Sequence, residues 1–279
     1  MMASTLHHAA PPAEPSSDAP VLAVHDLVVE RSTSAGRIVV VDGVTFEVEQ
    51  GEFVCLLGPS GSGKTSILGV LAGLDAPTSG RALVRGQPVT SSGPDRSVLF
   101  QDPALFPWLS VRGNVELALR LVGVARPERA RTAWEWIEAV GLTRFGDAQP
   151  HELSAGMRQR AALARALATH PDVVLADEPF GALDAQAREL LQDEILGVWA
   201  LGKGRTTFLF VTHNVREAAL LADRILVLSA PPGRLVEEVR IDAARPRSLD
   251  DALISRVVTD VHELLMSEVR QDVQLRLEN

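Results

Sequence analysis

The sequence predicts an α/β fold that is interrupted by a block of helices. Short apolar runs typical of buried strands alternate with helix-like segments over most of residues 21–241. One such run, Phe53–Leu57, is followed by a glycine-rich turn and then by an amphipathic segment starting at Ser66. Between about residues 104 and 170 the strand-like runs give way to helical patterns. We therefore predict one core domain with an inserted helical subdomain.

The elements follow one another along residues 21–279, which we take as one domain. Residues 1–20 carry four prolines among alanine and serine without apolar periodicity, which predicts a disordered leader. The helical subdomain is expected at about 104–170 and a C-terminal helical extension at about 249–276. Strands are expected at Val21–Val24, Val39–Val41, Val44–Val48, Phe53–Leu57, Ala82–Arg85, Val98–Gln101, Val173–Ala176, Thr207–Val211, Ile225–Leu228 and Leu235–Ile241. Helices are expected at Val111–Val122, Arg126–Val140, Ala155–Ala168, Gln186–Leu201 and Asn214–Ala222.

Composition limits the classes of function. The formal net charge of −9 argues against broad electrostatic binding to nucleic acid. A single cysteine, Cys55, allows no disulfide within the chain and fits a reducing compartment. No apolar run approaches the length of about 18 residues that spans a bilayer. We expect a cytosolic chain whose link to a membrane comes through a partner.

Residues 58–65 fit the phosphate-binding pattern G-x-x-x-x-G-K-[S/T] at every fixed position. In this strand-to-helix setting, backbone N–H groups and the helix N-terminus can surround the phosphates of a nucleotide. Lys64 would reach the β- and γ-phosphates, and the Thr65 hydroxyl would ligate Mg²⁺. The alternative is a glycine-rich turn that matches by chance. The predicted phosphate-binding residues are Gly58, Pro59, Ser60, Gly61, Ser62, Gly63, Lys64, Thr65 and Ser66.

Two acidic residues end a later apolar strand. Asp177 and Glu178 follow directly on Val173–Ala176. Asp177 would hold Mg²⁺ through its water shell, and Glu178 would polarise the water that attacks the γ-phosphate. An acidic turn after a core strand is common. The pair indicates a nucleotide site only because the phosphate loop is also present.

A third segment places a serine at the start of a helix. Ser154 is predicted to be the N-cap, and the positive end of that helix can accept a phosphate. By itself this pattern favours an ordinary capped amphipathic helix, because capped helices are common. The segment is Leu153, Ser154, Ala155, Gly156 and Met157.

Taken together, these motifs resemble the ATP-binding-cassette (ABC) ATPases over about residues 21–232. The phosphate loop, Gln101, the Leu-Ser-x-Gly segment, Asp177-Glu178, Gly181-Ala182-Leu183-Asp184 and Thr212-His213 occur in that family's order. The resemblance implies a P-loop NTPase cassette with a mixed β-sheet core and an antiparallel β layer near the N-terminus. It also implies ATP and Mg²⁺ as cofactors.

The resemblance assigns further roles. Gln101 is expected to contact Mg²⁺ and sense the γ-phosphate, and His213 to contact the γ-phosphate and support the catalytic Glu178. Two copies are expected to bind head to tail, with Asp184 in the loop between protomers. Ser154 and Gly156 of one copy then close on the ATP held by the other.

Within the family, the chain looks most like the ATPase subunits of nitrate, sulfonate and taurine importers. That likeness implies an ATP-hydrolysing subunit, peripheral at the cytoplasmic face of the inner membrane. Its expected partners are an integral membrane permease and, through it, an external solute-binding protein; no nucleic acid is expected. The likeness rests on Phe100–Pro103, Leu105–Leu109, Met157–Arg160 and Leu228–Arg234.

Two residues near the glutamine are open to two interpretations. Phe106 and Trp108 are aromatic anchors of the kind that protein interfaces use, and in the family a permease helix docks beside this segment. They equally suit the core of the helical subdomain.

The chain departs from the family pattern at two places. Ala155 replaces a glycine common in the signature, and its methyl group would crowd a partner's γ-phosphate. The aromatic residue that usually stacks on adenine is missing, because the first aromatic residue is Phe46. We expect Val40 and Arg31 to contact the base, Arg31 through its guanidinium plane, with Arg37 as an alternative. The preference for adenine should then be relaxed.

Two other functions compete with transport. Non-transport cassettes of DNA repair, chromosome or translation systems usually carry coiled-coil insertions, zinc sites or tandem cassettes, and none is visible here. A regulatory module would hold nucleotide but hydrolyse little. The presence of both Glu178 and His213 argues against it.

Overall fold

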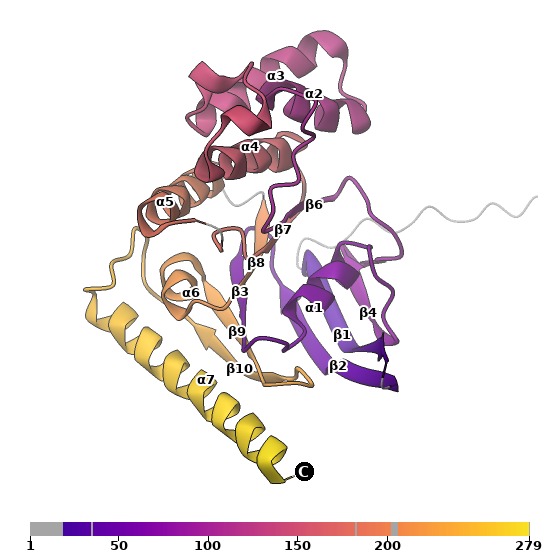
Figure 1. Ribbon diagram of the computed structural model, residues 1–279, viewed down its shortest axis with the longest axis vertical. Helices are drawn as coiled ribbons and strands as arrows, with labels where there is room; N and C mark the ends of the chain where they lie inside the picture. Colours follow the sequence, from indigo (N-terminus) through magenta and orange to yellow (C-terminus); the bar gives the residue numbers. More distant parts are fainter. Residues whose placement is uncertain (1–18, 35, 182, 202–205, 279) are drawn as a thin grey trace, which may run out of the picture.

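The computed structural model describes residues 19–278 except 35, 182 and 202–205, so most of the predicted leader lies outside the described residues. The N-terminal part forms a four-stranded antiparallel sheet in the order β2-β1-β4-β5 (Figure 1). The antiparallel β layer predicted from the resemblance is therefore confirmed. The two expected strands at 39–41 and 44–48 belong to one strand. The bounds are β1 Leu22–Thr33, β2 Gly36–Val48, β4 Ser79–Val84 and β5 Gln87–Pro88.

The second sheet has six strands in the order β10-β9-β3-β8-β7-β6. Only its edge strand β10 is antiparallel to its neighbour, so the predicted mixed sheet is confirmed. The carboxyl ends of its parallel strands meet at one edge, where α/β proteins bind ligands. The bounds are β3 Phe53–Leu57, β6 Arg96–Leu99, β7 Val173–Asp177, β8 Thr207–Thr212, β9 Arg224–Leu228 and β10 Leu235–Arg240.

Helix α1 (Lys64–Leu71) packs between the two sheets (Figure 1). Successive side chains of β3 point to opposite faces, and both faces are buried. Val54 and Leu56 join α1 and the N-terminal sheet in one core cluster. Phe53, Cys55 and Leu57 belong to a second cluster with the helices on the other face. The strand before the phosphate loop is therefore fixed from both sides.

The helical segment is built from α2 (Val111–Leu121), α3 (Arg126–Ala139) and α4 (Ala155–Ala168), which lie together at one end of the molecule (Figure 1). The buried Asn114 ties down the loop that precedes α2. Its Oδ1 accepts a hydrogen bond from Phe106 N at 2.8 Å, and its Nδ2 donates to Leu109 O at 3.2 Å. Trp108 within this loop is 70% exposed and packs against Phe106. The aromatic pair is thus at the surface and not in the subdomain core.

Three helices complete the fold: α5 (Ala185–Leu201), α6 (Val215–Leu221) and α7 (Ala252–Glu278). The C-terminal extension is one helix that runs beside α6 (Figure 1). It packs on the core through the buried Ile254 and Val261. Within the described ranges, none of the helices has the length and hydrophobicity that crossing a bilayer requires.

Candidate nucleotide-binding and catalytic site

A cavity of about 520 Å³ opens at the carboxyl edge of the six-stranded sheet. Four separate segments supply its walls: one residue of β2, the phosphate loop with the start of α1, the residue after β7 and the residue after β8. It is lined by Val40, Ser60, Gly61, Gly63, Lys64, Thr65, Ser66, Glu178 and His213. Most of the residues predicted to bind phosphate thus share one space with two of the predicted catalytic residues.

The loop between β3 and α1 depends on glycine at two positions. Gly61 and Gly63 both have φ of 82°, a left-handed conformation that residues with a Cβ rarely adopt. A Cβ on Gly63 would also lie 2.5 Å from Cγ2 of Val41 and 2.9 Å from the carbonyl oxygen of Val40. The loop therefore packs on β2 with its backbone. Within the described part of the chain, no side chain caps the start of α1, which lines the cavity, and uncapped N–H groups at a helix start can bind an anion.

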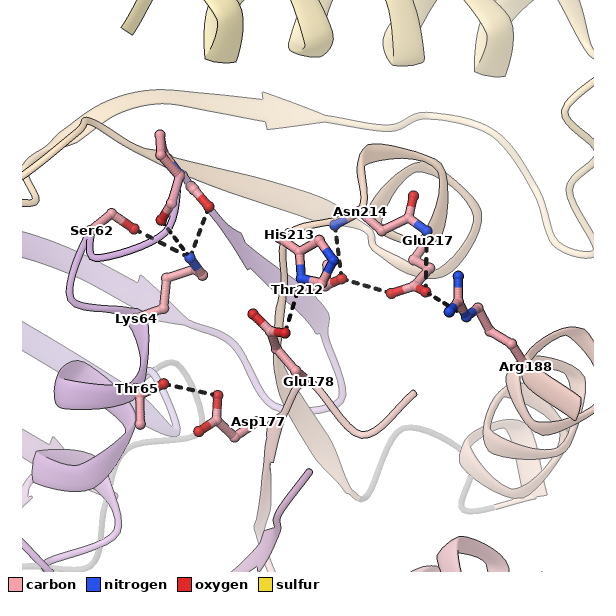
Figure 2. A network of polar contacts seen from close by, with 12 residues as sticks. Ser62, Lys64, Thr65, Asp177, Glu178, Arg188, Thr212, His213, Asn214 and Glu217 are labelled. Atoms are coloured by element: carbon pink, nitrogen blue, oxygen red, sulfur yellow. Dashed lines mark hydrogen bonds and ion pairs between the residues drawn. The ribbon is translucent and has the colours of Figure 1, made fainter. Parts of the chain in front are cut away.

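Lys64 is the cation of the cavity, and its side chain is held by the loop itself. Nζ donates hydrogen bonds to the carbonyl oxygens of Gly58 and Pro59, each at 2.8 Å, and contacts Ser62 Oγ at 3.4 Å (Figure 2). Burial lowers the pKa of Lys64, while the negative charges of Glu178 and Asp177 oppose that shift. An anionic phosphate in the cavity would further favour the charged ammonium.

Oxygen ligands suitable for Mg²⁺ meet beside Lys64. Thr65 Oγ1 donates a hydrogen bond to Oδ1 of Asp177 at 3.2 Å (Figure 2). Burial raises the pKa of Asp177, and the Thr65 hydroxyl acts in the opposite direction. A hydroxyl and a carboxylate side by side fit the oxygen coordination that Mg²⁺ prefers, together with nucleotide phosphates. Gln101 does not line this cavity. Its side-chain amide lies against Gly181, because a Cβ added to Gly181 would be 2.9 Å from Nε2 of Gln101.

Glu178 and His213 contact each other at the wall of the cavity. Nδ1 of His213 lies 2.9 Å from Oε2 of Glu178 (Figure 2). Glu178 has φ of 44°, an unusual conformation for a residue with a side chain, and strain of this kind is concentrated at functional sites. Its N–H donates to the carbonyl oxygen of Val211 at 3.0 Å, which fixes the end of β7 against β8. The arrangement can orient a water molecule at the carboxylate of Glu178.

Comparison of the sequence with known proteins identifies the family of this chain. Residues 41–181, just over half of the chain, match the family described as ABC transporter. The chain belongs to this family. The resemblance inferred from the motifs is therefore confirmed.

Individual relatives of this cassette cover most of its length. An uncharacterised ABC transporter ATP-binding protein of Methanocaldococcus jannaschii is 47% identical, over 81% of this chain and 84% of that protein. A nitrate import ATP-binding protein of Synechocystis is also 47% identical, over 74% of this chain and 77% of that protein. A taurine import ATP-binding protein of Burkholderia thailandensis is 42% identical, over 91% of this chain and 98% of that protein.

Solved structures agree with the predicted cassette fold. A dimeric ATP-binding cassette in a post-hydrolysis state, bound to ADP and Pi, is similar with a TM-score of 0.70 and 29% identity. A second dimeric structure, described as a bacterial ABC transporter cassette, gives a TM-score of 0.70 and 30% identity. Each match covers 80% of this chain and 100% of the other chain.

The signature segment of the cassette lies apart from the cavity of its own chain. Ser154 caps α4, as predicted, because its Oγ accepts a hydrogen bond from Met157 N at 3.3 Å. Leu153 is buried, Ser154 is exposed, and Ala155, Gly156 and Met157 are partly buried. None of the five lines the cavity. Asp184 is exposed and caps α5, because its Oδ1 accepts a hydrogen bond from Ala187 N at 2.8 Å.

The residues predicted to contact the base lie on β1 and β2. Val40 lines the cavity, while Arg31 borders it: its guanidinium pairs with Asp75 at 2.5 Å and reaches Ser66 Oγ at 3.4 Å. The hydrogen bond to Asp75 raises the pKa of Arg31. No Phe, Tyr or Trp is among the residues that line the cavity.

A turn that sequence reasoning did not assign to the site supports Val40. Gly233 N donates to Val40 O at 2.9 Å, and Asp42 N donates to Gly233 O at 3.0 Å. A Cβ on Gly233 would overlap the carbonyl oxygen of Ser62. The Pro-Pro-Gly-Arg run had signalled only a subgroup of the family, although its glycine packs directly on the phosphate loop.

Two further residues missed in the sequence lie behind residues 212–214, which we call the switch loop. Glu217 is buried, and its carboxylate accepts a hydrogen bond from Thr212 Oγ1 at 2.7 Å (Figure 2). Arg188 of α5 lies 3.5 Å from the same carboxylate. The spacing of Glu217 on an apolar helix face was the signal that could have found it.

Proposed function

We propose that this cassette is the ATP-hydrolysing subunit of an importer that takes up a small solute through a separate membrane permease. The observation that carries the proposal is the joint placement of Lys64, Thr65, Glu178 and His213 around one cavity. The relatives named for nitrate and taurine import support the importer assignment and a solute of that class. A peripheral position at the cytoplasmic face of the inner membrane follows from this role.

In the proposed site, the loop from Gly58 to Ser66 surrounds the phosphates with backbone N–H groups, and Lys64 turns from its own loop carbonyls to the β- and γ-phosphates. Thr65 and Asp177 would hold Mg²⁺, with Gln101 approaching from the neighbouring loop. When bound, the ion neutralises phosphate charge. Glu178 orients and polarises the attacking water, and His213 holds that carboxylate and contacts the γ-phosphate.

The lack of signature residues in the lining of the cavity supports a head-to-tail homodimer. Ser154 and Gly156 lie at the exposed start of α4, where a second copy can receive them against its own bound ATP. Asp184 then lies in the loop between the protomers. The dimeric cassettes among the structural relatives support this assembly. Ala155 adds a methyl group at the contact, so closure should be weaker than with glycine.

The exposed pair Phe106 and Trp108 is the proposed permease-docking site. Asn114 fixes the backbone of the loop, so the two rings are presented on a rigid support. Exposed aromatic side chains on a rigid loop are typical anchors of protein interfaces. An external solute-binding protein would act through the permease.

The test is to purify Glu178→Gln protein with ATP and Mg²⁺ from detergent-solubilised membranes and identify the proteins that accompany it. Slow hydrolysis should trap the closed dimer, and an integral membrane permease should co-purify. Wild type without nucleotide is the matched control. Recovery of only soluble protein or nucleic acid, with the closed dimer demonstrated, would reject the transport role in favour of a non-transport cassette.

A further inference from the structure

A buried carboxylate behind the switch loop has no part in the chemistry proposed above. The side chain of Glu217 is 8% exposed, although ionised carboxylates are costly to remove from water. It lies on α6, on the side of the switch loop away from the phosphate loop (Figure 2). A charge is kept in such a position only when its partners compensate for lost hydration.

The partners of Glu217 flank His213 on both sides. Thr212 Oγ1 donates to Oε2 of Glu217 at 2.7 Å, and Asn214 Nδ2 donates to Oε1 at 3.2 Å. The Thr212 hydroxyl in turn accepts from Asn214 N at 3.0 Å. The side chain of His213 is 66% exposed, so packing restrains the ring little. Apart from the contact of Nδ1 with Glu178, the direction of the ring therefore depends on the backbone that Glu217 holds.

Arg188 connects the same carboxylate to the segment before α5. Its Nε lies 3.5 Å from Glu217 Oε1, and its Nη2 donates to Leu183 O at 3.2 Å. Its own N–H donates to Asp184 O at 3.0 Å. Among the described residues, Nε of Arg188 donates no hydrogen bond, so its contact there is the ion pair with Glu217. A guanidinium can make both side-chain contacts at once because its donors are fixed in a planar fork.

We propose that Arg188 and Glu217 are positioning residues that set the direction of His213 and couple it to the loop at Leu183 and Asp184. This inference rests on the proposed ATPase function. Movement of the loop at 183–184 when a second copy binds would be transmitted through Arg188 to the carboxylate and then to the switch loop. His213 would face Glu178 productively only when that loop is in place.

The experiment compares Arg188→Met and Glu217→Gln with wild type in the full chain. For each protein, kcat and KM for ATP are measured, together with binding of a fluorescent ATP analogue. Both variants are expected to lose about tenfold in kcat with KM and analogue affinity within about twofold, because only the orientation of His213 changes. Arg188→Lys, which keeps the charge without the fork, should recover part of the loss.

The decisive comparison is made in a His213→Ala background. If Arg188 acts through His213, adding Arg188→Met to His213→Ala should lower kcat no further, since residues of one unit are not additive. An equal loss in both backgrounds would overturn the proposal. So would an unchanged kcat in a folded Arg188→Met protein.

Arg224→Met serves as the control for removing a buried arginine ion pair. Arg224 pairs with Glu52 at 2.7 Å at the start of β9, the end of the sheet away from the cavity. Its loss should lower the melting temperature and leave kcat within about twofold. If Arg188→Met does not fold, kcat is compared instead for Glu217→Gln and Arg188→Lys, each in the wild-type and the His213→Ala backgrounds.

A readout without hydrolysis separates this inference from the proposed function. The ring resonances of His213, assigned by their loss in His213→Ala, are recorded by NMR in nucleotide-free protein. They should shift in Arg188→Met and stay in place in Arg224→Met; the opposite pattern contradicts the positioning role. A wild-type protein without ATPase activity, alone or with its permease, contradicts the proposed function instead.

Discussion

Nδ1 of His213 lies 2.9 Å from Oε2 of Glu178, although 35 positions separate the two residues in the sequence. The sheet explains this contact. Asp177 pairs with Val211 in the parallel register of β7 and β8, so the residues that follow the two strands emerge side by side. The carboxylate and the imidazole are therefore brought together by strand order, at the edge where the phosphate loop also ends.

Glu178→Gln should abolish most hydrolysis while ATP still binds. Loss of a group that polarises water typically costs about 10²–10⁴-fold in rate. We expect a fall in kcat within that range and an affinity for a fluorescent ATP analogue within a few-fold of wild type. Glu135→Gln, at an exposed position of α3, is the control and should leave kcat unchanged. A Glu178→Gln protein with near-normal kcat would exclude Glu178 from catalysis.

Gly63→Ala should disrupt the phosphate loop, whereas Gly123→Ala should not. Both glycines have left-handed φ, 82° and 86°, so each substitution carries a conformational cost of about 1–2 kcal/mol. Only at Gly63 does the added Cβ also meet Val41 and the backbone of Val40. Isothermal titration with ATP should show loss of binding for Gly63→Ala alone. Equal binding by both variants would contradict the packing argument.

The stability of the protein should depend on pH through Glu217. Burial raises the pKa of this carboxyl above 4.5, and Thr212, Arg188, Asn214 and His213 offset the shift only in part. Between 4.5 and the raised pKa, the native state binds more protons than the unfolded state, so the free energy of unfolding falls as pH rises. Glu217→Gln lacks this contribution.

The check on Glu217 is the melting temperature of wild type and of Glu217→Gln across this pH window. The advantage of wild type over the variant should be largest at the acidic end and shrink as pH rises through the raised pKa. Other titrating groups act on both proteins and cancel in the difference. An advantage that grows with pH would mean that the pKa of Glu217 is lowered in the fold.

GTP should compete with ATP for the cavity with an affinity within about tenfold, because no stacking ring is available to select adenine. Arg31→Ala should weaken both nucleotides by a few-fold if its guanidinium covers the base. Competition against a fluorescent ATP analogue measures both effects. Arg37→Ala tests the alternative cation, and strong selectivity for ATP would require a base contact not present in this cavity.

Trp108→Ala should prevent capture of the permease without changing the melting temperature. The indole is 70% exposed, so its removal leaves the fold intact while deleting the proposed anchor. Leu121→Ala is the matched control, since Leu121 is 75% exposed on α2 at the surface of the same helical segment. Permease recovery with the Trp108 variant, or loss with both variants, would argue against this docking site.

Much of the fold could be predicted from the sequence because its signals are local. The buried strands are continuous apolar runs, and Ser154 caps its helix through contacts within three residues. The phosphate loop owes its form to glycines that reach left-handed conformations within the loop itself. The exposed position of Trp108 could not be predicted, since an aromatic residue after a proline suits both a core and an interface.

The sequence alone determined the motifs and the family, and from them it predicted which residues bind phosphate, ligate magnesium and activate water, because these are properties of residue types in a short motif. Only the tertiary structure decided that Glu178 faces His213, that Arg188 meets Glu217, and that Arg31 is engaged by Asp75. Each contact joins separate elements of the chain. Their geometry follows from strand order and helix packing, and their strength follows from burial, neither of which is encoded by neighbouring residues.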